Sequence, residues 1–128
     1  EVAATYRDAR VMPRRATVRD VLAKRIGSEP FDLVYAAGLF DYLEQPVAAA
    51  LTARMFDLVA PGGRLLLANF TPDTPDIGFM EAMLEWHLVY RAEADMWALL
   101  DGIAPQASAR TWRDPGGCIV YLEVERSR

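Results

Sequence analysis

Three polar side chains stand directly after apolar runs of the sequence, where an α/β protein places groups that act on a ligand. Asp41 and Tyr42 follow the apolar run at residues 31–37, and Asn69 closes a second run that begins at Arg64. Ligands of open α/β sheets bind beyond the carboxyl ends of the strands. We therefore expect Asp41 and Tyr42 to be catalytic and Asn69 to contact the substrate. Capping of the following helix is an equally good reading of Asp41.

The only histidine is His87, and its neighbours make it a candidate catalytic residue. Trp86 and Glu85 adjoin it, and Tyr90 lies about one helical turn further on. We expect Trp86 and Tyr90 to contact the substrate and His87 to act on it. The alternative is a histidine of the core or its rim, on the apolar face of a helix. No cysteine or histidine stands at ligand spacing from His87, so a metal site is not expected.

Length and composition describe one globular domain with no affinity for nucleic acid. A chain of 128 residues can bury one core, and 52% hydrophobic with 25% charged residues is ordinary for a folded protein. The net charge of −4 argues against binding to DNA or RNA. One basic cluster exists near the N-terminus, and we interpret it as a solvated surface: Arg14, Arg15, Arg19, Lys24 and Arg25.

The expected compartment is the cytoplasm. Cys118 is the single cysteine, so no disulfide within the chain is possible and an oxidising compartment is not implied. No apolar stretch approaches the ~20 residues of a membrane span, and no signal peptide is recognisable. The sequence starts at Glu1 without an initiator methionine, which makes a fragment an alternative.

Apolar periodicity and turn residues divide the chain into alternating strands and helices, which indicates an α/β fold. Asp114, Pro115, Gly116 and Gly117 form a hairpin turn, and Pro61, Gly62 and Gly63 stop the helix before them. The expected strands cover residues 16–18, 31–37, 64–70, 109–113 and 118–125. The expected helices cover residues 2–10, 20–26, 45–59, 79–90 and 92–100.

This order of elements resembles the class I S-adenosylmethionine-dependent methyltransferases, and residues 31–70 carry most of the resemblance. In that family an acidic residue opens the fourth strand, as Asp32 does here. A Pro-Gly-Gly turn leads into the fifth strand, as residues 61–63 do. The resemblance implies a truncated Rossmann-like sheet, mostly parallel, with helices on both faces and a C-terminal antiparallel hairpin. It also implies a substrate lid in the helix after the fifth strand.

A narrower resemblance concerns three segments, which read YAAGLFDYL, ANFTPD and MLEWHLVYR. They are similar to segments of bacterial methyltransferases linked to fatty-acid methyl ester signals. The implied acceptor is small or lipid-like, with a carboxylate as one candidate. Methyl transfer to a carboxylate needs alignment more than acid–base help, so a missing catalytic dyad does not argue against it.

The resemblance also implies which residues meet S-adenosylmethionine. Thr17 and Val18 stand where the family contacts adenine, although threonine replaces the usual carboxylate. The small residues after the fourth strand allow a ligand to approach the backbone, and their alternative role is tight strand–helix packing. This implied cofactor turn consists of Ala36, Ala37, Gly38 and Leu39.

A glycine-rich cofactor loop is absent from the sequence, which contains no Gly-x-Gly. The glycine pairs at 62–63 and 116–117 each lead into a strand rather than open a helix. We therefore expect residues 1–128 to be a single domain, the C-terminal part of a methyltransferase domain that lacks its first two strands. The parent protein would be the enzyme, and this chain alone would be inactive.

Two other functions remain open. A methyltransferase-like domain without its cofactor loop could persist as a structural or interaction module. A Rossmann oxidoreductase is disfavoured by the terminal hairpin and by the missing dinucleotide fingerprint. Without strands one and two, the strand at 31–37 becomes an edge. We expect two chains to form a homodimer through this edge, unless the short strand at 16–18 pairs with it instead.

Overall fold

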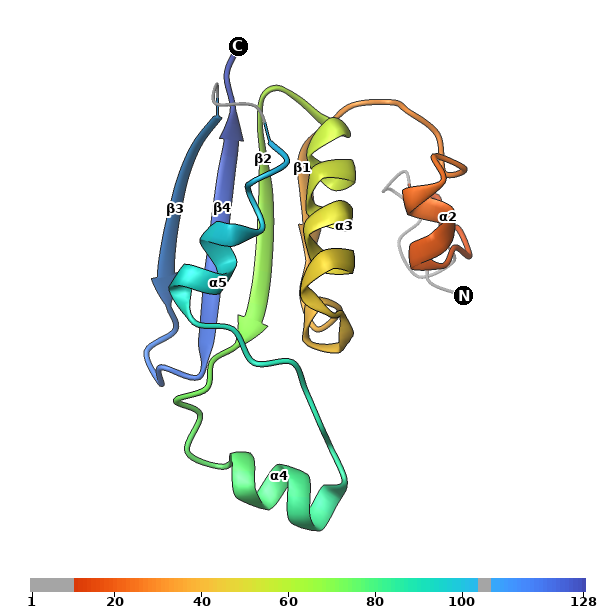
Figure 1. Ribbon diagram of the computed structural model, residues 1–128. Coiled ribbons are helices and arrows are strands. Elements are labelled where there is room, and N and C mark those ends of the chain that lie inside the picture. Colours follow the sequence, from red (N-terminus) through yellow and green to blue (C-terminus); the bar gives the residue numbers. More distant parts are fainter. Residues whose placement is uncertain (1–10, 104–106) are drawn as a thin grey trace.

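A computed structural model describes residues 11–103 and 107–128 of the chain and shows a four-stranded sheet with short helices (Figure 1). The strand order is β1-β2-β4-β3. The strands are β1 (Phe31–Ala36), β2 (Val59–Phe70), β3 (Ala107–Arg113) and β4 (Ile119–Arg126). The helices are α2 (Val18–Leu22), η1 (Phe40–Tyr42), α3 (Gln45–Asp57), α4 (Ile77–Leu84) and α5 (Glu93–Ala98). The helix expected at residues 2–10 lies outside the described residues.

The sheet is mixed, and the expectation of a mostly parallel sheet is wrong for the described strands. Only β1 and β2 are parallel, whereas β4 is antiparallel to both β2 and β3. The tight turn at residues 114–117 reverses the chain, and this makes β3 and β4 a hairpin as expected. The strand order places β4 inside the sheet and β3 at its edge, and Val120, Leu122 and Val124 of β4 are fully buried.

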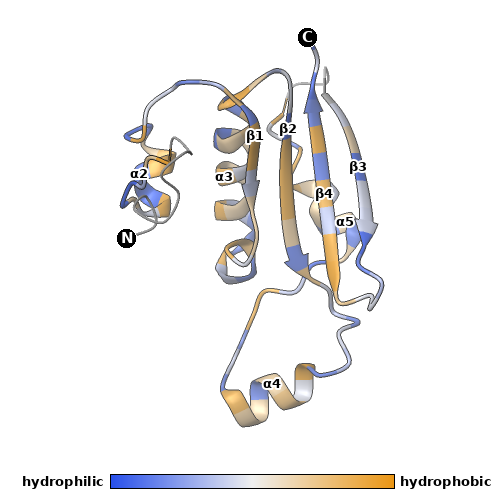
Figure 2. Ribbon diagram, turned by 180° about the vertical axis from the view of Figure 1, so that it is seen from behind, coloured by the Kyte–Doolittle hydropathy of each residue, from blue (hydrophilic) through white to orange (hydrophobic). Residues whose placement is uncertain are grey.

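The described helices cover one face of the sheet, contrary to the expectation of helices on both faces. In Figure 1 both α3 and α5 lie in front of the sheet. In Figure 2, which views the molecule from the opposite side, both lie behind it. The fully buried side chains of Leu65 and Leu67 face these helices. On the other face Leu33 and Tyr35 of β1 are 54% and 67% exposed. This uncovered face is apolar on the β1 side, while Arg110 pairs with Glu123 on the β3 side.

The strand expected at residues 16–18 does not form, because a capping box starts α2 at this point. Thr17 Oγ1 accepts a hydrogen bond from the amide of Asp20, and the amide of Thr17 donates to the Asp20 carboxylate at 2.9 Å. This reciprocal pair satisfies the free amides of a helix start and competes with extended structure. The expected helix at 20–26 corresponds to α2, which packs on α3.

The glycines at 62 and 63 lie inside β2, which begins five residues before the expected strand at 64–70. Gly63 passes so close to β1 that an added Cβ would lie 2.8 Å from the carbonyl oxygen of Asp32. The register between β1 and β2 shifts at this point, between Phe31 and Leu33. Glycine is therefore required for close approach of the two parallel strands, in addition to its role at the turn.

The expected helix at 79–90 is wrong in its second half, because α4 ends at Leu84. Glu85 adopts a left-handed backbone with φ of 50°. The amide of Trp86 then closes the helix end by donating to the carbonyl of Met80 at 3.0 Å. The chain returns to the sheet in extended form, and α4 projects from the end at which β2 finishes (Figure 1). No helix among the described residues is long and apolar enough to cross a membrane.

Candidate functional site

The candidate site lies at the carboxyl ends of β1 and β2, which meet at one edge because the two strands are parallel. Beyond β1 the chain makes the turn at residues 37–39 and the single 3-10 turn η1. Beyond β2 it leads into α4 and then returns through residues 85–92. Two segments far apart in sequence therefore meet here.

Asp41 lies in η1 with only 3% of its surface exposed, so its carboxyl group faces the protein interior. Its Oδ1 accepts a hydrogen bond from the amide of Phe70 at 2.7 Å. Its carbonyl oxygen accepts one from the amide of Val89. Burial raises the pKa of the Asp41 carboxyl, while the bond from Phe70 and the charge of Arg91 oppose that shift. Asp41 thus ties η1 to the end of β2 and to the returning segment.

Asn69 is likewise buried, at 1% exposure, and does not face a cleft. Its Nδ2 donates to the carbonyl oxygens of Phe70 and Val89 at 2.9 and 2.8 Å. Its Oδ1 accepts from Arg91 NH1 at 2.7 Å. With both ends of its amide bonded inside the protein, Asn69 orients the chain around the site.

Arg91 is the centre of this network, and sequence reasoning missed it. It is 1% exposed and among the largest fully buried side chains of the described residues. Its guanidinium donates to Phe40 O, Asn69 Oδ1, Leu43 O and Gln45 Oε1 at 2.5–2.7 Å. Burial lowers the pKa of Arg91, and the Asp41 carboxylate opposes this effect. The available signal was that residues 65–90 contain no lysine or arginine, so Arg91 is the first basic residue after Arg64.

Tyr42 and Trp86 meet at the surface of the site. Trp86 Nε1 donates to the Tyr42 hydroxyl at 2.8 Å. The Trp86 ring also packs edge-on against Phe70, with ring centroids 5.9 Å apart. Tyr42 is 58% exposed, so it remains open to a ligand. The structure therefore joins two of the expected site residues, one from each side of the site.

His87 and Tyr90 lie on the extended return segment rather than on a helix. The side chain of His87 is exposed, which removes the alternative of a buried core histidine. Burial raises the pKa of the Tyr90 phenol, and the nearby carboxylates of Glu81 and Asp41 raise it further. Tyr90 is half-buried, and its hydroxyl stays protonated and neutral near pH 7.

The implied cofactor turn is open at its middle. Ala36 is buried at the end of β1, whereas Ala37, Gly38 and Leu39 are exposed. Gly38 has φ of +79°, and an added Cβ there would meet no atom within 4 Å. A ligand can therefore reach the backbone at this turn.

The other two residues implied to meet a cofactor lie elsewhere. Thr17 caps α2, and its hydroxyl is bonded to the Asp20 carboxylate at 2.6 Å. Val18 is the first residue of that helix and packs against the core. Neither residue follows a described strand. The expectation that Thr17 and Val18 stand at the end of a strand, where the family contacts adenine, is therefore wrong.

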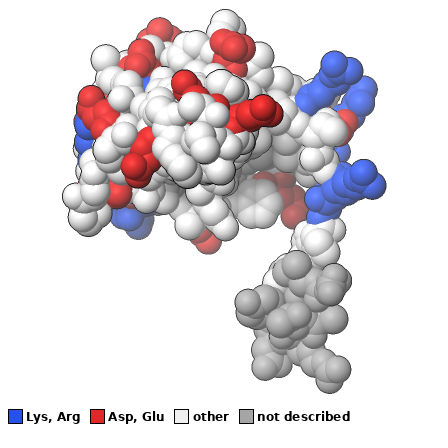
Figure 3. Space-filling model, turned by 90° about the horizontal axis from the view of Figure 1, so that it is seen from below, with Lys and Arg blue, Asp and Glu red and all other residues white. Residues whose placement is uncertain are grey.

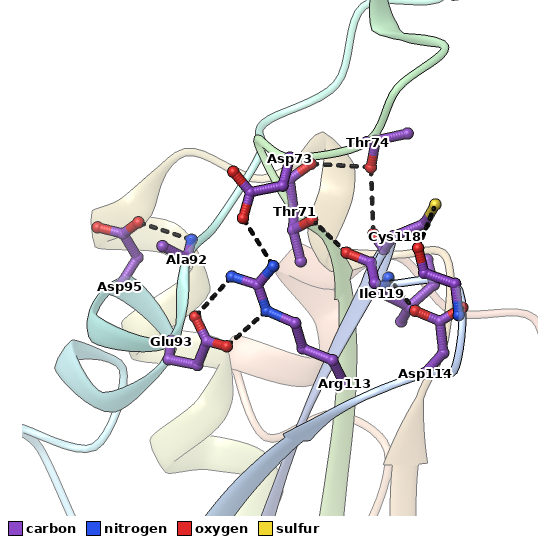
Figure 4. A network of polar contacts seen from close by, with 12 residues as sticks. Thr71, Asp73, Thr74, Ala92, Glu93, Asp95, Arg113, Asp114, Cys118 and Ile119 are labelled. Atoms are coloured by element: carbon purple, nitrogen blue, oxygen red, sulfur yellow. Dashed lines mark hydrogen bonds and ion pairs between the residues drawn. The ribbon is translucent and has the colours of Figure 1, made fainter.

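An ion-pair clamp fixes the loop that leads from β2 to α4 (Figure 4). Arg113 at the end of β3 holds both carboxylate oxygens of Glu93, at 2.6 and 2.9 Å. Its remaining nitrogen donates to Asp73 at 2.6 Å. These bonds lower the pKa of Glu93 to about 2. The clamp joins β3, α5 and the start of the loop, and no sequence pattern predicted it.

Comparison with solved structures identifies the fold. No protein-family model matches the chain, and no curated protein matches it either. The S-adenosylmethionine-dependent methyltransferase SibL is 21% identical, with a TM-score of 0.67 over 99% of this chain and 39% of SibL. An O-methyltransferase family protein from Burkholderia thailandensis is 17% identical, with a TM-score of 0.68 over 92% of this chain and 36% of that protein.

A third similar structure holds a product of methyl transfer. Magnesium protoporphyrin IX methyltransferase from Synechocystis, solved with S-adenosylhomocysteine, is 22% identical, with a TM-score of 0.58 over 84% of this chain and 49% of that enzyme. The chain thus spans less than half the length of each of these three proteins. At these identities the likeness establishes the fold, which is that of the class I methyltransferases, and confirms the resemblance at the level of the fold.

Proposed function

We propose that this chain is part of an S-adenosylmethionine-dependent methyltransferase that acts on a small or lipid-like acceptor. The observation that carries the proposal is the arrangement at the carboxyl ends of the parallel strands. There an open turn at Ala37, Gly38 and Leu39 adjoins η1, which bears the exposed Tyr42. Because the described sheet has a methyltransferase-like fold, we interpret this arrangement as part of a methyltransferase site.

The residues present fit one side of a cofactor site. The open turn after β1 would hold the cofactor through its backbone, because Gly38 leaves space at its middle. S-adenosylmethionine supplies an electrophilic methyl group on a sulfonium. The protein's contribution is then chiefly to hold an acceptor in line with that methyl group. Thr17 and Val18 are no longer part of the proposed site.

The roles of the remaining candidates divide between chemistry and support. Tyr42 and His87 are exposed and stay candidate catalytic residues, with Trp86 and Tyr90 as candidate substrate contacts. Asp41 and Asn69 are committed to buried hydrogen bonds, so we propose that they act by holding η1 and the return segment.

We further propose that residues 1–128 form the C-terminal part of a longer methyltransferase domain. Two observations support this: the chain covers only 39% of SibL and 36% of the Burkholderia thailandensis protein, and one face of the described sheet is bare of described helices. A homodimer through β1 is the proposed state of the isolated chain. The cytoplasmic location and the lack of nucleic-acid binding remain part of the proposal. A non-catalytic module is the competing function.

Nuclear magnetic resonance titration of the 128-residue chain with S-adenosylmethionine tests the cofactor side. We expect weak binding, in the millimolar range, because the glycine loop and a ribose-binding acid are absent. The amide shifts should concentrate at Ala37, Gly38 and Leu39. Gly38→Val should remove them, since it fills the open turn and strains a backbone with positive φ.

Gly116→Val, in the hairpin turn between β3 and β4, is the control and should leave the shifts unchanged. Shifts that avoid the turn at every concentration would contradict the proposed cofactor site and favour the non-catalytic module. A micromolar dissociation constant would contradict the proposal that the site is incomplete.

A further inference from the structure

The positive and negative charges of the chain are segregated along its sequence. Residues 11–29 contain five basic and two acidic residues, which gives this segment a net charge of +3. Residues 30–128 contain seven basic and fourteen acidic residues, which gives a net charge of −7. The total charge of −4 therefore conceals one positively charged segment, and a local charge of this kind attracts anionic partners.

The positively charged segment is fixed to the body of the molecule through α2. Its apolar side chains Val18, Val21 and Leu22 pack against the core. From α3, Arg54 donates hydrogen bonds to the carbonyl oxygens of Val21 and Gly27, each at 3.3 Å. Because these contacts hold α2 and the following turn against α3, the exposed side chains of the segment keep a defined arrangement.

Three cations of this segment are free to meet a partner. Arg15, Arg19 and Lys24 are exposed, and their side chains form no hydrogen bond or ion pair with any described residue. Figure 3 shows a group of lysine and arginine side chains on the side of the molecule where α2 lies, while aspartate and glutamate are spread over the remaining visible surface. We define the basic surface as Arg14, Arg15, Arg19, Lys24 and Arg25.

Exposed apolar side chains directly precede the basic surface in the chain. Met12 is 72% exposed and Val11 36% exposed, and only Pro13 separates them from Arg14. Binding at a bilayer interface depends on apolar side chains that enter the headgroup region and on cations that are attracted to anionic lipids. The segment offers both kinds of group.

Two other occupants match this combination less well. DNA or RNA would attract the cations, but its phosphate backbone offers no apolar region to Met12 and Val11. A further part of a longer domain would have to bury the three free cations, which is costly unless each of them meets a carboxylate. An anionic bilayer leaves the cations hydrated at its surface and receives the apolar side chains beneath them.

We propose that the basic surface, together with Val11 and Met12, attaches the chain reversibly to membranes that contain anionic phospholipids. The attachment is peripheral, with the cations at the lipid phosphates and Met12 in the headgroup region. It requires no rearrangement of α2, because the apolar side of this helix remains packed on the core. Membrane attachment goes beyond the proposed function and does not depend on methyl transfer.

Sedimentation of the 128-residue chain with lipid vesicles tests the proposal. Vesicles of phosphatidylcholine provide a neutral surface, and vesicles of phosphatidylcholine with phosphatidylserine provide an anionic one. We expect the partition coefficient to be higher by about tenfold or more for the anionic vesicles at low salt. Sodium chloride at about 0.5 M should remove most of this difference, because salt screens the attraction.

A charge variant tests whether the basic surface makes the contact. Joint replacement of Arg15, Arg19 and Lys24 by glutamine should weaken binding to the anionic vesicles by about tenfold or more. These side chains have no described partner to lose, so the fold should be retained, and circular dichroism checks it. The matched control removes the same charge from exposed positions outside the basic surface, by glutamine at Arg64, Arg110 and Arg128. It should bind about as the native chain does.

A second variant separates a membrane from a nucleic acid. Met12→Ser should weaken binding to the anionic vesicles, because it removes the apolar side chain that enters the headgroup region. Binding to a DNA duplex, measured by fluorescence anisotropy, should be weaker than binding to the vesicles. Tighter binding to the duplex, or vesicle binding that Met12→Ser leaves unchanged, would overturn the membrane as the partner.

Three further outcomes would overturn the proposal. They are equal binding to neutral and anionic vesicles, no binding to either, and equal losses for the glutamine variant and its control. The vesicle assay contains no S-adenosylmethionine, so each of these results leaves the cofactor titration free to support or contradict the methyltransferase function.

Discussion

At the scale of single residues, the site depends on a buried cation that holds loops together. Arg91 reaches two carbonyls of the η1 region and the end of β2 from a segment some fifty residues later in sequence. The planar guanidinium donates several bonds in fixed directions, which an ammonium group cannot reproduce. Asp41 supplies the opposing charge nearby. Tyr42 thus owes its position beside Trp86 to a residue with no expected role.

Replacement of Arg91 should destabilise the chain strongly. We expect Arg91→Ala to lower the free energy of unfolding by about 3–5 kcal/mol, because it removes the opposing charge near the buried Asp41 carboxylate and the donors that bond the carbonyls of Phe40 and Leu43. Arg91→Lys should recover only part of the loss. Arg110→Ala, which breaks an exposed ion pair with Glu123, should cost about 0–1 kcal/mol. Denaturant unfolding measures all three, and equal losses for the two alanine variants would contradict the role of Arg91.

At the scale of elements, two glycines have opposite structural roles. Gly63 sits where β2 crosses close to β1, and an added Cβ would meet backbone oxygens at 2.8 and 3.0 Å. Gly78 lies in α4, and an added Cβ would meet nothing within 4 Å. The first glycine permits the parallel pairing that creates the site, and the second only weakens a helix.

The two alanine variants should therefore change the stability of the chain in opposite directions. Gly63→Ala should destabilise the chain by about 1–3 kcal/mol, because rigid backbone cannot move aside. Gly78→Ala should leave the stability unchanged or raise it by up to about 1 kcal/mol, since alanine favours helix. Thermal unfolding followed by circular dichroism compares them. A neutral Gly63→Ala would show that β1 and β2 can separate without cost.

At the scale of the whole molecule, the sheet has one unpaired parallel edge. Among the described strands, β1 pairs only with β2. Thr17 caps α2, so the strand expected at residues 16–18, which would have paired with this edge, does not form. The β1 side chains Phe31, Leu33 and Tyr35 are all more than half exposed. An apolar edge of this kind is a template for another strand, and in the isolated chain a second copy is available to provide it.

Light scattering during size-exclusion chromatography should accordingly find a dimer of the isolated chain at high concentration. Leu33→Lys should shift the population to monomer, because a charge on an edge strand opposes strand addition. Leu84→Lys is the control, since Leu84 is 56% exposed on α4, away from the edge. A monomer at every concentration, or dissociation by the control alone, would contradict pairing through β1.

The sequence by itself determined the elements whose signals are local. The apolar run at 31–37, the helical spacing after Gln45 and the turn at 114–117 predicted β1, α3 and the β3–β4 hairpin. Local periodicity and turn chemistry reflect forces that act within a few residues. The position of Tyr42 and Trp86 near a common site also followed from this order.

Only the tertiary structure decided how these elements combine. It placed β4 between β2 and β3 and left one face of the sheet without described helices. It also ended α4 at Leu84. It also turned Asp41 and Asn69 inward to Arg91, a residue 50 positions from the first of them. Such contacts depend on which surfaces can be buried together across the whole chain. No local pattern contains that information, and for this reason the support of the site emerged only in three dimensions.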